Sequence, residues 1–177
     1  GQSNHLPALP DQALATLYHE AVHQLFHESR KAARHVGQVA NFWVIEGVAT
    51  YFESLAQHVD SAGQPYYTIG TTTAGRLPAA VERAVKDQFY LPLADFTRFG
   101  TFDLQRNPDI RQLYSQAAGL ATFLMHAREG VYREPFVQYL LDVYAGRDNG
   151  ASLAEATGQT SAELDRQYLE FLQSMDR

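Results

Sequence analysis

Apolar residues recur along the first third of the chain at the three- and four-residue steps of α-helices. The first such stretch covers residues 11–34, and its apolar stripe consists of Leu14, Leu17, Tyr18, Val22, Leu25 and Phe26. The second covers residues 41–59, with Phe42, Ile45, Ala49, Phe52 and Ala56 on one stripe. We therefore expect two long helices, separated by a break at residues 37–40.

The rest of the chain predicts shorter elements. Residues 66–73, with Gly70 between two runs rich in Tyr and Thr, are typical of either a short hairpin or an extended loop. Residues 91–108 contain two prolines and several phenylalanines, which favours a packed connecting loop with one helical turn. Helical segments are expected over residues 78–88, 109–128, 135–144, 150–157 and 160–175, the last with a capping box of Thr160 and Glu163.

This order of elements predicts a mainly α fold with at most one short hairpin. No internal repeat, low-complexity tract or long linker divides the 177 residues, so we expect a single domain over residues 1–177. Because the chain starts at Gly1 without a Met or a signal-peptide pattern, we expect it to be part of a longer chain.

Composition narrows the possible partners and chemistry. A net charge of −6 argues against a nucleic-acid partner. No apolar run is long enough to span a membrane. The absence of cysteine excludes disulfides, Cys-ligated zinc and a thiol nucleophile. The compartment is left open, with an extracytoplasmic one favoured.

The most informative motif is HEAVH, residues 19–23, which fits the pattern HExxH. Residues four apart on a helix share one face, so the imidazoles of His19 and His23 can converge on one metal ion. Glu20 lies on a neighbouring flank, where a carboxylate can act as a general base beside a zinc ion. The alternative is an amphipathic helix that carries surface histidines.

A metal site of this kind needs a third ligand. His27 shares the face of His19 and His23, but it lies ~6 Å beyond His23 along the helix axis, so we expect a surface or structural role. Glu46 is the better candidate, because a carboxylate within an apolar helical stretch is costly to bury unless it is paired or bound to metal. Gly47 beside it is expected to allow close approach of the HExxH helix.

Glu53 follows Glu46 by two helical turns. It can accept the free ring N–H of a zinc-bound histidine, which is a supporting contact that such ligands need. A solvated acid near a helix end is an equally good interpretation.

These two segments resemble the gluzincin metallopeptidases, in which HExxH is followed by a W-x-x-E-G-x-A-x-Y-x-E helix; here the residues are HEAVH and WVIEGVATYFE. The resemblance implies that His19, His23 and Glu46 bind Zn²⁺, that Glu20 is catalytic and that Glu53 supports a ligand. The spacing of 22 residues between His23 and Glu46 is longer than in the aminopeptidase branch, and the G-x-M-E-N substrate loop of that branch is missing. The chain is more similar to the uncharacterised peptidase-MA-like bacterial domains.

The resemblance continues more weakly into YSQAAG, residues 114–119. It implies that Tyr114 stabilises the oxyanion of the tetrahedral intermediate, and a phenol can donate the required hydrogen bond. The alternative is a packed tyrosine with a solvated hydroxyl. His126 on the same helix is expected to be a satisfied core or surface residue rather than a transition-state donor, and His35 and His58 are expected near helix ends. Arg76, in a loop, is a candidate for contacting a carboxylate.

The resemblance also implies a zincin-like helical catalytic domain whose usual upstream sheet is missing, because only 18 residues precede His19. Either that sheet belongs to a longer chain, or residues 66–73 supply a substitute strand. The leading hypothesis is a zinc-dependent peptidase acting on a peptide or protein substrate. The second is a non-catalytic helical binding module with a structural or vestigial zinc site, and a third is an all-α interaction domain without metal.

Overall fold

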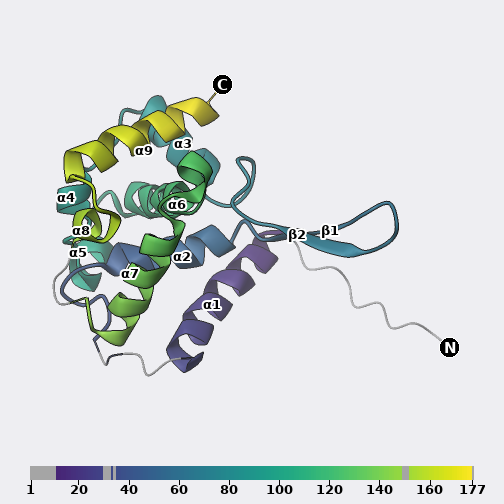
Figure 1. The fold of residues 1–177 in the computed structure, drawn as a ribbon, viewed down its shortest axis with the longest axis horizontal. Helices are drawn as coiled ribbons and strands as arrows, with labels where there is room; N and C mark the ends of the chain where they lie inside the picture. Colours follow the sequence, from purple (N-terminus) through teal and green to yellow (C-terminus); the bar gives the residue numbers. More distant parts are fainter. Residues whose placement is uncertain (1–10, 30–32, 34, 149–151, 177) are drawn as a thin grey trace.

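The computed structural model describes residues 11–29, 33, 35–148 and 152–176. These residues form a mainly helical fold with one short hairpin, as the sequence predicts (Figure 1). The elements are α1 (Asp11–Ser29), α2 (Phe42–Phe52), β1 (Ala56–Val59), β2 (Pro65–Thr68), α3 (Leu77–Val85), α4 (Leu93–Phe96), α5 (Thr101–Gln105), α6 (Ile110–His126), the 3₁₀ helix η1 (Ala127–Gly130), α7 (Arg133–Ala145), α8 (Leu153–Thr157) and α9 (Ser161–Met175).

The centre of the molecule is the contact between α2 and α6. Both helices are buried along most of their length, and α2 is flanked by α7 and α1. Trp43 is fully buried and stacks on Phe136, with a ring-centroid distance of 6.0 Å. A helix that is apolar around most of its circumference is stable only when neighbours cover several faces, and α2 meets this condition.

Gly47 allows α2 to approach α6 and not, as we expected, the HExxH helix. A Cβ atom at position 47 would lie 2.9 Å from the backbone oxygen of Ala117 and 3.6 Å from Cβ of Ala121, both on α6. The expected packing role of this glycine is therefore correct, but its expected partner is wrong. The sequence indicates that a small residue is required at position 47, but it does not indicate which helix this residue faces.

The second helix is shorter than expected. It ends at Phe52, and residues 56–59 form a strand instead of its last turn. The hydroxyl of Ser54 donates to the Tyr51 carbonyl (2.6 Å) and accepts from the backbone N–H of Gly70 (2.7 Å), so it binds the end of the helix to the loop after β2. The apolar spacing continues to Ala56, but pairing with β2 supplies the backbone hydrogen bonds there.

A hairpin forms, but its first strand precedes the segment 66–73 where a hairpin or an extended loop was expected. β1 pairs antiparallel with β2, with Ala56 opposite Thr68 and Val59 opposite Pro65; residues 71–73 are not its second strand. Asp60 closes the turn, since its carboxylate accepts from the backbone N–H groups of Ala62 and Gln64. The hairpin projects from the helical body (Figure 1).

Three further boundaries differ from the sequence prediction. The first helix ends at Ser29; of the expected extension, Ala33 is not helical, and residues 30–32 and 34 lie outside the described residues. The expected loop at 91–108 contains two short helices, α4 and α5. Residues 150 and 151 of the expected segment 150–157 also lie outside the described residues, and α8 occupies the remainder.

The last helix begins where its capping signal predicts. The Thr160 hydroxyl accepts a hydrogen bond from the backbone N–H of Glu163 (3.1 Å). The Glu163 carboxylate accepts from Arg166 and Gln167. In the part of the chain that the structure describes, no helix combines the length and the apolar character needed to cross a bilayer.

Candidate metal centre

The metal-ligand candidates come from two helices that pack side by side. α1 places His19 and His23 one turn apart, and α2 presents Glu46 from its buried face. The two Nε2 atoms are 3.1 Å apart. The Glu46 carboxylate lies 3.6 Å from Nε2 of His19 and 3.9 Å from Nε2 of His23. Within the described residues, these three side chains form the group that could hold a metal ion.

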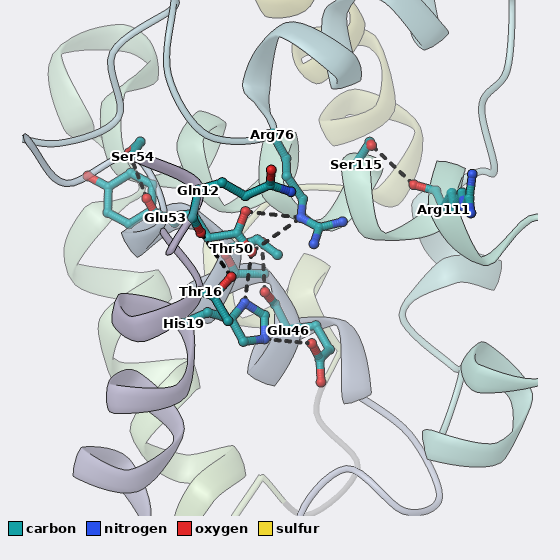
Figure 2. A network of polar contacts seen from close by, with 12 residues as sticks. Gln12, Thr16, His19, Glu46, Thr50, Glu53, Ser54, Arg76, Arg111 and Ser115 are labelled. Carbon is teal, nitrogen blue, oxygen red and sulfur yellow. Dashed lines mark hydrogen bonds and ion pairs between the residues drawn. The ribbon is translucent and has the colours of Figure 1, made fainter. Parts of the chain in front are cut away.

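The orientation of the His19 ring is set by Glu53. Nδ1 of His19 lies 2.9 Å from Oε1 of Glu53 (Figure 2). An ionised carboxylate can only accept, so Nδ1 carries the proton in this contact. Nε2 faces His23 and Glu46, and its lone pair becomes free for a metal ion once this nitrogen loses its own proton.

The spacing of the three donor atoms fits a small tetrahedral ion. Zinc–nitrogen and zinc–oxygen bonds of ~2.0–2.2 Å at tetrahedral angles place two ligand atoms ~3.3–3.5 Å apart. The observed separations of 3.1, 3.6 and 3.9 Å lie on both sides of this range. Two imidazoles and one carboxylate are a donor set that suits Zn²⁺ and leaves the fourth position open.

The charges around the two histidines differ. Hydrogen bonds to Glu46 and Glu53 raise the pKa of His19 from 6.5 to about 9. Burial lowers the pKa of His23, and the nearby His19 adds to this effect. Before metal binds, the site therefore carries one proton near neutral pH, mainly on His19.

Glu20 lies at the edge of this site. It is exposed, and it lines a groove of about 620 Å³ together with His23 and Glu46. The apolar part of the same groove is formed by Ala33, Val36, Phe42, Ile45 and Tyr144. An exposed carboxylate beside half-buried imidazoles can exchange protons with water in the groove.

Glu53 contacts a second partner besides His19. The Nε atom of Arg76 donates to Oε2 of Glu53 at 3.1 Å and to Oε1 at 3.3 Å (Figure 2). Arg76 thus meets a carboxylate, as expected for this residue, and Glu53 is a bridge between His19 and Arg76 rather than a solvated acid. Its side chain is only 11% exposed.

Tyr114 lies at the same site. The Arg76 guanidinium carbon is 5.6 Å from the centroid of the Tyr114 ring. Burial and then the negative charge of Glu46 raise the pKa of the Tyr114 phenol to about 12, so the phenol stays protonated at neutral pH. α6 therefore brings a hydrogen-bond donor to the Glu46 side of the site.

The other histidines among the described residues lie outside the ligand group. His27 is exposed along the groove, and His126 pairs with the Tyr51 hydroxyl (2.7 Å), which fits the expected satisfied histidine. His58 is not near a helix end: it lies on β1, where it pairs with Thr68 (2.8 Å). His35 lies in a turn, because the first helix ends earlier than expected.

Two functional contacts were not predicted. Arg76 was expected to contact a carboxylate, but that this carboxylate belongs to Glu53 depends on the course of the loop after β2, and no sequence pattern indicates it. Tyr144 is buried beside Phe26, and its hydroxyl has no hydrogen-bond partner among the described residues. Its position in the groove next to Glu46 depends on the packing of α7 against α1 and α2.

Comparison of the sequence with known protein families gives a match. Residues 13–143 match the model of a family described as "Protein of unknown function (DUF1570)". The chain belongs to the DUF1570 family. The matched residues run from α1 into α7 and include both histidines of HEAVH, Glu46, Glu53, Arg76 and Tyr114.

Membership of DUF1570 brings no named activity with it. Searches of curated proteins and of solved structures found no match to this chain. The function has to be argued from the chemistry of the site itself.

Proposed function

We propose that this DUF1570 protein is a zinc-dependent peptidase of the gluzincin type, which hydrolyses a peptide or protein substrate. The observation that supports this most directly is the convergence of two imidazole Nε2 atoms and a buried carboxylate within 3.1–3.9 Å of one another, with Glu53 behind His19. Buried acids and imidazoles in this geometry are the usual composition of a catalytic zinc site.

His19, His23 and Glu46 would hold the ion. A zinc ion there supplies Lewis acidity, which acidifies water and polarises the carbonyl of the scissile bond. Glu20 accepts a proton from water at its carboxylate and later gives it to the amine nitrogen as the carbon–nitrogen bond breaks. The products are a carboxylate and an amine, so one water is consumed for each bond cleaved.

Glu53 and Tyr114 have supporting roles: Glu53 orients a ligand, and Tyr114 stabilises negative charge on the substrate. Glu53 holds the Nδ1 proton of His19, which keeps Nε2 free for the ion. Tyr114 keeps its proton at neutral pH and can donate to the negative oxygen that develops on the substrate. An oxyanion donor of this kind contributes ~10²–10³-fold in kcat.

The first test is the zinc content of the purified chain, measured by elemental analysis after dialysis against trace zinc. We expect about one zinc per chain in the parent and clearly less in Glu46→Ala, because a site with two protein ligands binds zinc weakly. A parent without zinc under these conditions would contradict the proposal.

The second test separates binding from turnover. Glu20→Gln preserves the size of the side chain but removes the base, so we expect zinc binding to persist and cleavage of a peptide library to fall by ~10²–10⁴-fold. Equal cleavage by this variant would disprove the mechanism. A zinc-loaded parent that cleaves no peptide would favour the non-catalytic binding module.

A further inference from the structure

Arg76 has an unused hydrogen-bonding edge next to the proposed zinc site. Its Nε atom is engaged by both carboxylate oxygens of Glu53. Its two terminal nitrogens point away from Glu53 in Figure 2, and no described residue accepts a hydrogen bond from them. The side chain is 42% exposed, so this edge is open to a ligand.

The orientation of this edge is fixed from two sides. Glu53 holds the Nε side of the guanidinium, and the ring of Tyr114 lies 5.6 Å from its central carbon. A guanidinium that is held in this way loses little conformational freedom when it binds a planar partner. Arg76 is thus pre-organised, which is unusual for an arginine that only balances the charge of one acid.

The surroundings give a ligand room to reach the site. The loop before Arg76, residues 73–75, lines a groove of about 730 Å³ with the N-terminal half of α1 and the start of β1. Glu53 is part of the wall of this groove. Arg76 itself does not line this groove, but its partner Glu53 does, so a chain bound there would lie beside the Glu53–Arg76 pair.

We propose that the free edge of Arg76 binds a carboxylate of the substrate and so selects peptides that carry one near the scissile bond. This inference rests on the proposed peptidase function for the identity of the ligand. Two parallel N–H groups match the two oxygens of a carboxylate, and lysine cannot reproduce this fork. The carboxylate is either the C-terminus of the peptide or the side chain of Asp or Glu.

Electrostatics favour an anion at this position. Glu53 shares its charge with Arg76 and His19, so the pair does not leave an excess of negative charge on the open edge. Charge-assisted hydrogen bonds of this kind are stronger than neutral ones, and a bidentate contact corresponds to about 10- to 100-fold in affinity.

The test is peptide binding measured by calorimetry in a Glu20→Gln background, where peptides are not consumed. Three N-acetylated apolar pentapeptides are compared: one with a free C-terminus, one with a C-terminal amide, and one with the amide and a central Glu. The variants are Arg76→Gln, Arg76→Lys and, as a matched control, Arg98→Gln, which changes an exposed arginine beside α4. Each protein is measured with and without zinc.

We expect at least one carboxylate peptide to bind the parent about 10-fold or more tightly than the neutral amide. Which of the two does so identifies the source of the carboxylate. The preference should vanish in Arg76→Gln, weaken in Arg76→Lys and persist in Arg98→Gln. If this pattern appears but the zinc-loaded protein with Glu20 intact cleaves none of these peptides, the peptidase function fails and the carboxylate site stands.

Two outcomes would overturn the inference. The first is a parent that binds all three peptides equally, or a preference that survives in Arg76→Gln. The second is a preference that vanishes in Arg76→Gln only in the presence of zinc and together with the loss of bound zinc, because Arg76 would then only position Glu53.

Discussion

The two halves of the candidate zinc site belong to regions of very different character. Glu46 lies on α2, which is buried against α6 and α7 in the centre of the molecule. His19 and His23 lie on α1, which packs mainly against α2 and keeps Leu17 and Leu25 more than half exposed. In Figure 1, α1 lies at the margin of the helical body, close to the base of the projecting hairpin.

Because of this difference, the two helices contribute to the site in different ways. The central helix holds the carboxylate in one place, because α2 cannot move without disturbing the core. The marginal helix supplies the imidazoles and Glu20, the proposed general base, and Glu53 and Arg76 secure it near the end of α2. An ion bound by residues of both helices would therefore fasten the marginal helix to the core.

The largest loss of stability should follow a substitution in the core. Trp43→Ala removes a fully buried indole that stacks on Phe136, and we expect the free energy of unfolding to fall by about 3–5 kcal/mol. Leu25→Ala on the marginal helix should change it by less than about 0.5 kcal/mol, because Leu25 is 61% exposed. Chemical denaturation measures both. Equal losses would show that α1 is as much part of the core as α2.

Zinc binding should reduce the difference in stability between the marginal helix α1 and the central helices. At a free zinc concentration of about 100 times Kd, binding to the folded state alone adds about 2.7 kcal/mol to the free energy of unfolding. Hydrogen exchange should slow most on α1, since α6 is already protected by burial. Glu46→Gln serves as the control and should show neither change. Uniform slowing over both helices would contradict the fastening role.

Glu53→Gln tests the contact behind the ligand. The amide has no negative charge and only one acceptor oxygen, so it holds His19 and Arg76 less strongly than the carboxylate does, and we expect zinc affinity to fall by ~10–100-fold while the fold is retained. Competition with a chelating dye measures the affinity, and circular dichroism checks the fold. Unchanged affinity would mean that Glu53 only pairs with Arg76.

The smallest expected effect is the dependence of stability and zinc affinity on the protonation of His19. Because Glu46 and Glu53 raise the pKa of His19 to about 9, the metal-free chain gains stability from the protonated ring. This gain is fully present below pH 6.5 and is lost as the pH rises through about 9. Zinc must displace the proton, so its apparent affinity should rise across this interval.

Calorimetry of zinc binding at pH 7.5, in buffers of different ionisation enthalpy, measures the proton count. We expect close to one proton released per zinc, from His19, since the pKa of His23 is lowered and its ring is already neutral. Glu53→Gln should release less. Binding without proton release would show that His19 is not protonated in the free chain.

Much of the fold could be predicted because helical periodicity is strong in α3, α6 and α9. The prediction failed at residues 56–59, where apolar spacing persisted beyond the end of α2. Residues 57–59 are exposed, so a helix would bury little there, and pairing with β2 satisfies the backbone instead. It also failed at the short helices α4 and α5, whose few residues are held by packing and by local caps.

The sequence by itself determined the ligand candidates, because residues four apart on a helix must share a face, and an acid within an apolar stretch must find a partner. It also determined the mainly helical class. Only the tertiary structure decided which face of α2 meets α1, that Gly47 serves the contact with α6, and that Arg76 reaches Glu53. These contacts join residues distant in sequence, and their geometry depends on the packing of whole elements rather than on any local pattern.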